Sequence, residues 1–400
     1  MDFFKVTFQP QKSHTRLGII HTAHGDIETP CFVPVATRAS LKSLSSEEIS
    51  ATHTQLAFVN TYHLHLRPGD EIINNLGGIH TFMHYRGPLI SDSGGFQAFS
   101  LGYGLVHGVG KIANIFPDED TRPINFQNAK KSLVRFTDEG IYFRSHLDGR
   151  KIILTPQKSI SIQENLATDI ALVLDECTSP LSSKKYVYEA LQRTEKWALS
   201  CLESHKLKSQ ALLGIVQGSR FPDLRLMACQ NISKLPFSGL AVGGDFGRSK
   251  KDMVNLIRLV ISNLPKNMFR HVLGIGEIDD IFNIIENGAD SFDCVMPTRL
   301  GRMGQILTAQ KPKAKSQKFR YNILKSVYEN DKSPLDAQCA CWVCQNYSRA
   351  YIHHLFRARE LLGYRLATFH NVYFLNSLLT EIRLSIKAGK FSELKTGWLG

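Results

Sequence analysis

Residues 291–302 decide the fold, and they read Ser291-Phe292-Asp293-Cys294-Val295-Met296-Pro297-Thr298-Arg299-Leu300-Gly301-Arg302. The stretch begins as a short apolar strand, is stopped by Pro297 and runs into two arginines. Asp293 lies inside the apolar part, where an unpaired carboxylate is costly unless it is hydrogen-bonded, coordinated or used. Asp293 is therefore either a structural acid held by backbone N–H groups or a catalytic group, and this stretch alone leaves both interpretations open.

Short apolar runs of the same kind recur along the chain and end abruptly in polar or glycine residues. There are eight: Cys31–Thr37, Leu56–Asn60, Leu89–Ser91, Ile170–Leu174, Ala211–Val216, Gly239–Val242, His271–Ile275 and Ser291–Met296. Near-continuous apolar strands are typical of parallel sheets with both faces buried. Most intervening segments have room for a helix, and Lys185–His205 and Asp252–Leu264 have amphipathic patterns. This alternation predicts an α/β fold, a (β/α)₈ TIM barrel rather than an open doubly wound sheet.

The residues that follow these runs are mostly polar. They are Asn60, Asp92, Asp175-Glu176, Gln217, Gly243-Gly244, Gly276-Glu277 and Asp293. In a barrel the carboxyl ends of all strands meet on one face, and that face carries the active site. Polar residues commonly follow strands, but their repetition around the barrel favours a shared pocket.

Size and charge narrow the class of protein. The chain has 400 residues, 43% of them apolar, and a formal net charge of +12. That length fits either one large barrel with an appendage or two to three ordinary domains. No apolar run approaches the roughly 18–20 residues that a membrane span needs, and the start shows no signal peptide, so no membrane partner is expected. The positive charge favours a polyanionic partner, nucleic acid first, with a merely soluble basic protein as the alternative.

Three cysteines lie together in Cys339-Ala340-Cys341-Trp342-Val343-Cys344. Thiolates this close repel one another unless they are protonated, oxidised or metallated, and Zn²⁺ accepts sulfur and imidazole in closed four-ligand structural sites. The clustering points to a metal in a reducing cytosol, hence a cytoplasmic protein. His353 and His354, on the predicted helix Tyr347–Leu362, and His370, 26 positions beyond Cys344, are the candidates for the fourth ligand. Spacing leaves that choice open; we choose His370, which can return to the cluster.

Two segments interrupt the rhythm. Gly102–Arg135 is long, polar and glycine-containing, with no clear strand before Gly140–Phe143, and we predict an insertion in a βα loop. Gln310–Arg320 carries five basic residues and is either a solvated linker or a phosphate-contacting stripe. The predicted domains are a catalytic barrel over residues 1–308, with the insertion near 102–135, and a zinc-binding subdomain with closing helices over 309–400.

With these residues assembled, the chain resembles the tRNA-guanine transglycosylases of bacterial type, the queuine tRNA-ribosyltransferase family. The motifs span nearly the whole chain: Thr22-Ala23-His24-Gly25, Asn60-Thr61-Tyr62-His63-Leu64, Leu66-Arg67-Pro68-Gly69, Ser91-Asp92-Ser93-Gly94-Gly95-Phe96-Gln97, Asp175-Glu176-Cys177-Thr178, Gln217-Gly218-Ser219, Phe292–Arg299 and Ser348–Leu355. The resemblance implies a zinc-bearing barrel that exchanges guanine at the wobble position of tRNAs with GUN anticodons (Asp, Asn, His, Tyr). The incoming base would be a 7-deazaguanine, prequeuine (preQ1) or queuine, in queuosine modification.

The resemblance also implies residue roles. Asp293 would be the nucleophile that attacks C1′ of the ribose, and Asp92 the general acid/base; a covalent intermediate suits a glycosidic bond that is broken without water and re-formed. Base or ribose contacts would come from Asn60, Ser93, Gly94, Gly95, Phe96, Gln97, Asp175, Cys177, Gln217 and Gly239. RNA contacts would come from Gly274, Ile275, Gly276, Glu277, Ile278, Asp279, Asp280, Thr298, Arg299, Leu300, Gly301 and Arg302. The zinc ligands would be Cys339, Cys341, Cys344 and His370.

One departure concerns the incoming base. Bacterial relatives commonly read Gly-Gly-Leu-Ala-Val-Gly-Glu where this chain has Ser238-Gly239-Leu240-Ala241-Val242-Gly243-Gly244, followed by Asp245. Gly244 stands where the usual acid would match a cationic aminomethyl group. We therefore expect a pocket enlarged for queuine, unless Asp245 replaces the lost acid.

A helical stripe and two rival functions complete the expectations. Tyr347, Tyr351 and His354 recur at i, i+4, i+7 spacing and either pack in the core or, as the resemblance suggests, contact a second subunit in a homodimer.

A non-catalytic zinc-containing tRNA-binding subunit would lack Asp92 or Asp293, and both are present. A metal-dependent barrel hydrolase would need histidines among the carboxylates at the strand ends, where this chain has amides.

Overall fold

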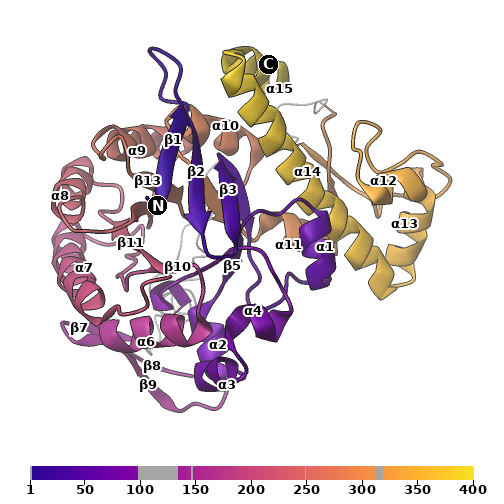
Figure 1. The fold of residues 1–400 in the computed structure, drawn as a ribbon. Coiled ribbons are helices and arrows are strands. Elements are labelled where there is room, and N and C mark those ends of the chain that lie inside the picture. The colour runs from indigo at the N-terminus through magenta and orange to yellow at the C-terminus, as the bar shows by residue number, and fades with distance from the viewer. Residues whose placement is uncertain (1, 98–133, 146, 248, 311–318) are drawn as a thin grey trace.

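The computed structural model describes residues 2–97, 134–145, 147–247, 249–310 and 319–400 (Figure 1). The predicted insertion near 102–135 lies almost wholly outside the described residues, as do 311–318 of the basic segment Gln310–Arg320.

The centre of the molecule is a barrel of eight parallel strands, as predicted. They are β4 (Cys31–Pro34), β5 (Ala57–Val59), β6 (Leu89–Ser91), β10 (Ile170–Leu172), β11 (Ala211–Val216), β12 (Gly239–Val242), β13 (Phe269–Val272) and β14 (Ser291–Cys294). They pair in the order β5-β6-β10-β11-β12-β13-β14-β4. A parallel bridge between Val35 and Phe58 brings the last strand back to the first, so the barrel is nearly closed.

One strand begins earlier than its pattern predicted. The prediction started at His271 because Arg270 interrupts the apolar run, but β13 begins at Phe269. Arg270 is buried and pairs with Leu240 of β12, so the ladder includes it, while its backbone N–H donates to the carboxylate of Asp290 at 2.8 Å. The strand ends before Gly274, whose φ of +78° belongs to the left-handed region.

Helices surround the barrel (Figure 1). The short helices α1 (Ser46–Ala51), α2 (Thr61–Leu66), α3 (Asp70–Asn75) and α4 (Gly78–Met83) lie between the first strands, and α6 (Pro156–Leu166), α7 (Lys184–Ser204), α8 (Pro222–Ile232), α9 (Lys250–Ser262), α10 (Ile278–Glu286) and α11 (Met296–Arg302) follow along the chain. The helices predicted at Lys185–His205 and Asp252–Leu264 are confirmed as α7 and α9. Ser183 caps α7 by accepting from the N–H of Tyr186, and its apolar stripe, which includes Val187 and Leu191, is buried.

In the described parts of the chain, three small antiparallel sheets flank the barrel. The pattern analysis did not predict β1 (Phe4–Phe8), β2 (Leu17–Thr22) and β3 (Gly25–Thr29), nor the pair β15 (Gln305–Leu307) and β16 (Arg320–Asn322). The third sheet contains β7 (Arg135–Thr137), β8 (Gly140–Arg144) and β9 (Lys151–Leu154). The strand expected at Gly140–Phe143 is confirmed as β8. The expectation that no strand precedes it was wrong, because β7 pairs with it through only three residues, too few to show a pattern.

The C-terminal part contains a 3₁₀ turn, η3 (Ser326–Tyr328), and the helices α12 (Trp342–Asn346), α13 (Arg349–Arg357), α14 (Leu361–Lys387) and α15 (Phe391–Leu399). A single helix over Tyr347–Leu362 was wrong: Arg359 has a φ of +58° and separates α13 from α14. Helix α14 packs closely on α11, since a Cβ on Gly301 would lie 2.8 Å from Cα of Thr368. The domain boundary between residues 308 and 309 stays a prediction. Across the described residues, we find no helix with the length and apolar character needed to span a membrane.

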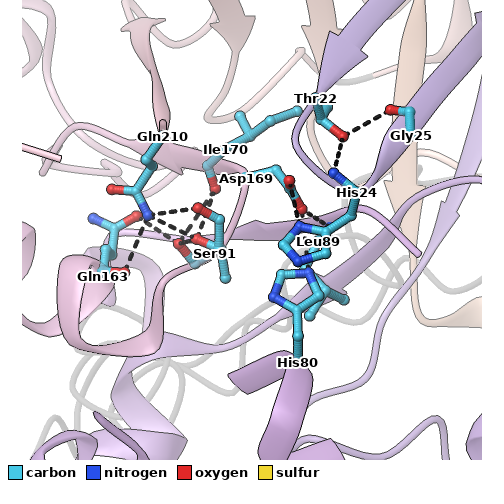
Figure 2. Close-up of polar contacts among 11 residues, drawn as sticks. Thr22, His24, Gly25, His80, Leu89, Ser91, Gln163, Asp169, Ile170 and Gln210 are labelled. Atoms are coloured by element: carbon cyan, nitrogen blue, oxygen red, sulfur yellow. Dashed lines mark hydrogen bonds and ion pairs between the residues drawn. The ribbon is translucent and has the colours of Figure 1, made fainter. Parts of the chain in front are cut away.

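A polar cluster joins the N-terminal sheet to the amino ends of the barrel strands (Figure 2). Asp169 directly precedes β10, and its Oδ1 lies 2.8 Å from Nδ1 of His24 in the β2–β3 turn. Its Oδ2 accepts from the N–H of Leu89 at 2.8 Å and lies 3.2 Å from Nε2 of His80 on α4. The two imidazole rings stack with centroids 3.5 Å apart. One buried carboxylate therefore links the hairpin, α4 and strand β6.

We expect Asp169→Asn to lower the free energy of unfolding at pH 7 by about 2 kcal/mol, because a buried charged acceptor is lost. Burial raises the pKa of Asp169, but His80, His24 and the Leu89 N–H outweigh it, so the pKa lies below its ordinary value. Because the folded-state pKa is depressed, the stabilisation is present above about pH 4 and is lost as the pH falls through the folded pKa. Urea unfolding at pH 7 and in acid measures both effects.

The matched control is Asp26→Asn, since Asp26 is exposed and pairs with His21 in the same hairpin. We expect it to change stability by less than about 0.5 kcal/mol. Equal stability of wild type and Asp169→Asn at pH 7 would contradict the role given to this cluster.

Candidate active site and metal centre

Asp92 directly follows β6, at the carboxyl end of the barrel, and it is buried. Its Oδ2 accepts hydrogen bonds from Nδ2 of Asn60 and Nε2 of Gln97, both at 2.6 Å. Its Oδ1 accepts from the N–H of Thr61 at 2.8 Å. These three donors fix the orientation of the carboxylate, and the structure thereby brings three of the predicted site residues, Asn60, Asp92 and Gln97, together.

Asp175 follows β10 and forms a second buried acidic centre. Its Oδ2 accepts from Nε2 of Gln217 at 2.6 Å, and its Oδ1 accepts from Oγ of Ser93 at 3.3 Å. Gly95 lies directly against it, because a Cβ there would be 2.7 Å from the Asp175 carbonyl oxygen. Carboxylate, amide and close backbone thus meet at the ends of β6, β10 and β11, as predicted for a base-binding pocket.

Asp293 lies within β14, on the strand next to β13. Its Oδ1 accepts from the N–H of Gly274 at 3.0 Å and lies 3.3 Å from Nε2 of His271. The side chain is 14% exposed, so it is neither sealed in the core nor freely solvated. The sequence left open whether Asp293 is a structural or a catalytic acid, and its surroundings suit both. A backbone N–H holds one carboxylate oxygen, and the carboxylate is still accessible from the carboxyl end of the barrel.

Of the other predicted base contacts, some lie beside these acids and one does not. Gly94, with a φ of +82°, forms the turn before Gly95, Phe96 is half-buried, and Cys177 is buried beyond Asp175. Gly239 is not brought to this group. It is the first residue of β12, in register with Phe269, the first residue of β13, and with Leu213 inside β11. The residues of this strand that reach the mouth are Gly243 and Gly244, so the assignment of Gly239 was wrong by the length of the strand.

Gly244 does not provide the extra space expected of it. Its φ is +83°, and a Cβ there would collide with Oε1 of Gln217. Asp245 is buried and already engaged, with Oδ2 accepting from Oγ of Ser219 at 3.1 Å and Oδ1 from the N–H of Gly247 at 3.0 Å. Position 244 therefore brings backbone against Gln217, and the argument for an enlarged pocket fails at this residue.

The predicted RNA contacts lie on two segments after neighbouring strands. Residues 274–277 lie in the connection from β13 to α10 and residues 278–280 form the first turn of α10; Glu277 pairs with Arg320 at 3.2 Å. Residues 298–302 lie on α11, where Thr298 and Gly301 are buried against α14 while Arg299 is exposed and Arg302 half-buried. Burial, together with the charges of Arg302, Arg38 and Arg299, lowers the pKa of Lys42. These four side chains form what we call the basic cluster.

The proposed metal ligands converge. The donor atoms of Cys339, Cys341, Cys344 and His370 all lie within 4.8 Å of one another. Nδ1 of His370 is 3.5 Å from Sγ of Cys341 and 3.3 Å from Sγ of Cys344, while its Nε2 faces the carbonyl oxygen of Leu307 at 2.9 Å. A histidine that donates its outer nitrogen to a carbonyl presents the inner one to a metal. The cluster could hold a metal ion, and its three-sulfur, one-nitrogen donor set is compatible with zinc.

The rival histidines lie elsewhere. Nδ1 of His353 is 2.8 Å from the carbonyl oxygen of Ile323, and His354 is exposed. On the same helix, the rings of Tyr347 and Tyr351 stack with centroids 5.6 Å apart, and Tyr351 is 40% exposed.

Pattern analysis missed three residues of the site. Arg38 and Lys42 follow β4, the neighbour of β14, and only that pairing places them beside Arg299. His271 was counted as a strand residue, although a histidine in an apolar strand that neighbours Asp293 is itself a signal.

Comparison with known proteins agrees with this geometry. The family model described as "Queuine tRNA-ribosyltransferase" matches residues 11–400. A putative queuine tRNA-ribosyltransferase of Archaeoglobus fulgidus is 48% identical over 389 residues, 96% of each chain. A queuine tRNA-ribosyltransferase of Roseiflexus sp. is 41% identical over 99% of this chain and 99% of its own length. One of Fusobacterium nucleatum is also 41% identical, over 95% of this chain and 93% of its own length. The chain therefore belongs to the queuine tRNA-ribosyltransferase family of pentosyltransferases.

Proposed function

We propose that this enzyme exchanges guanine at the wobble position of tRNAs with GUN anticodons for a 7-deazaguanine. The observation that carries the proposal is the pair Asp92 and Asp293. Both stand at the carboxyl side of the barrel, and hydrogen-bond donors orient each carboxylate. A family member lacking chemistry would have no reason to keep two such acids oriented, which disfavours a non-catalytic tRNA-binding subunit.

The exchange follows a double displacement. An oxygen of Asp293 attacks C1′ of the ribose as the C1′–N9 bond breaks, and the bond's electron pair leaves with guanine, which takes a proton from Asp92. The tRNA is then held as an ester of Asp293. The incoming base gives its N9 proton to Asp92 and attacks C1′, which releases the Asp293 carboxylate. Two carboxyl groups serving as nucleophile and acid/base are the arrangement of retaining glycosidases.

The base would be read by the second acidic centre. Asp175 and Gln217 offer an acceptor and an amide to a guanine edge, and the backbone at Gly95 and Gly243-Gly244 permits close approach of a flat ring. A flipped base reaches such a pocket only after leaving its stack. Guanine and 7-deazaguanines share this edge, so the pocket admits both, and preQ1 and queuine are distinguished only by the substituent.

Labelled-guanine exchange tests the proposal. Incubating tRNA that carries labelled guanine at the wobble position with preQ1, and separately with queuine, should release label with at least one of the two. A tRNA with adenine at that position should release none. Retention of label with both bases would refute the proposed function, and the ratio of the two rates identifies the preferred base.

The basic cluster of Arg38, Lys42, Arg299 and Arg302 would contact phosphates beside the wobble nucleotide. We expect Arg299→Ala and Lys42→Ala to raise KM for tRNA while leaving kcat little changed, because these side chains bind without reacting. Each should lower the slope of log KM against log salt concentration by about 1.

Lys184→Ala is the matched control for this cluster, since Lys184 is exposed on α7 and pairs with Asp223. Its salt slope should equal that of wild type. Unchanged slopes in the Arg299 and Lys42 variants would remove the cluster from the RNA-binding surface.

Three further assignments complete the proposal. The Cys339, Cys341, Cys344 and His370 cluster would hold one structural Zn²⁺ per subunit. The exposed face of α13 at Tyr351 would contact a second subunit in a homodimer. The enzyme would act in the cytoplasm, where its tRNA substrates are found.

A further inference from the structure

His271 is wholly buried beside the proposed nucleophile. It lies on β13 in register with Ser291 of β14, and Asp293 follows two residues later. Residues i and i+2 of a strand point to the same face, so the side chains of Ser291 and Asp293 lie in a row. The imidazole of His271 spans that row, with Nδ1 2.7 Å from Oγ of Ser291 and Nε2 3.3 Å from Oδ1 of Asp293.

The surroundings leave the ring little freedom. Phe58 lies on one side with ring centroids 6.3 Å apart, and Phe269 lies 6.5 Å away by the same measure. A neutral imidazole carries one N–H and one acceptor nitrogen. A carboxylate only accepts, so Nε2 must carry the hydrogen, and Nδ1 must then accept from the Ser291 hydroxyl. Asp293 thus selects the tautomer, and the Ser291 hydroxyl, which can donate, satisfies the other ring nitrogen.

Both donors to Asp293 meet on the same oxygen. The N–H of Gly274 and Nε2 of His271 both face Oδ1, and Oδ2 accepts no hydrogen bond within the part of the chain that the structure describes. Fixing one oxygen sets the plane of the carboxylate and leaves the other to attack. When Oδ2 is bonded to C1′, Oδ1 becomes the ester carbonyl oxygen, which still accepts from the same two donors.

We propose that His271 is a positioning residue for the nucleophile: it donates from Nε2 to Oδ1 of Asp293 and thereby directs Oδ2 at C1′. This inference rests on the proposed function, because it requires Asp293 to form the covalent bond. It extends that function by naming the side chain that orients the reacting group.

The test compares His271→Gln, →Asn and →Phe in the full-length enzyme. Glutamine places an N–H₂ about where Nε2 lies, asparagine is too short to reach Asp293, and phenylalanine keeps the ring but has no donor. We expect His271→Phe and His271→Asn to lower kcat by about 100-fold, because a small misplacement of reacting groups slows a reaction by about that factor. KM for tRNA should stay within about twofold of wild type. His271→Gln should recover most of the loss.

Single-turnover formation of the tRNA–protein adduct should fall in the same order as kcat. The proposal would be overturned if His271→Asn and His271→Phe had the kcat of wild type. It would also be overturned if all three variants lost kcat equally, because that result would indicate that His271 acts through packing alone. If →Phe fails to fold, the comparison of →Gln with →Asn still decides. Failure of wild type to exchange guanine would instead refute the proposed function, so the two failures are distinguishable.

Discussion

Replacing Asp293 with alanine is expected to lower the exchange of labelled guanine by at least about 10⁴-fold, since removing the covalent nucleophile of a serine hydrolase lowers kcat by about 10⁶-fold. The reason is that no other carboxylate among the described residues is held in the same place, where Gly274 and His271 fix Oδ1 of Asp293. Binding of tRNA should persist, because the basic cluster at Lys42 and Arg299 does not depend on Asp293.

Three measurements make this prediction sharp. Filter binding of tRNA should give a dissociation constant within about threefold of wild type, since the phosphate contacts are intact. Asp148→Ala, which removes an exposed carboxylate paired with Arg150, should exchange guanine at the wild-type rate. Asp92→Asn should also lose exchange, but through proton transfer, so it should still bind tRNA. Exchange surviving in Asp293→Ala would rule out the nucleophile assignment.

Loss of the metal should have the second largest effect. Cys341→Ser is expected to remove stoichiometric zinc and to lower the free energy of unfolding by about 4 kcal/mol or more, as loss of a structural metal typically does. Cys341 is buried, and its thiol lies against His370, which is rooted in the long helix α14. Without the metal, residues 339–344 would be attached to that helix by packing alone, as where the ring of Trp342 on α12 meets that of Phe369 with centroids 5.2 Å apart.

Metal analysis per chain and thermal unfolding measure the two parts of this prediction. Cys229→Ala is the matched control: that thiol is buried on α8, outside the cluster, where burial raises its pKa to about 11. It should keep its zinc. Unchanged zinc content in Cys341→Ser would contradict the metal assignment, and unchanged stability with lost zinc would make the site functional rather than structural.

The barrel could be predicted because its signal is local. Buried parallel strands are short apolar runs, and a polar residue marks the carboxyl end of most of them. Asp92, Asp175 and Asp293 could therefore be assigned to one face of the barrel from the sequence. The three cysteine ligands followed from the chemistry of close thiols, whereas His370 was a choice among three histidines that the family resemblance supported. What pattern could not give was pairing across strands, and therefore Arg38, Lys42 and the contact between His271 and Asp293 were missed.

The errors have physical causes too. Gly239 was placed in the pocket by the family resemblance, and only the strand register shows that it lies at the amino end of β12, away from the mouth of the barrel. The break between α13 and α14 rests on the backbone of Arg359, a residue type with no turn preference. The space at Gly244 was judged from its missing side chain, whereas Gln217, distant in sequence, fills it.

The central claim is that Asp293 becomes covalently attached to the ribose. The most direct measurement mixes the enzyme with tRNA and a guanine analogue that has carbon in place of N9, then separates the products under denaturing conditions. Since such an analogue cannot form the new glycosidic bond, a tRNA–protein adduct should accumulate, and peptide mapping should locate it at Asp293. Absence of any adduct, or an adduct at another residue, would contradict the account.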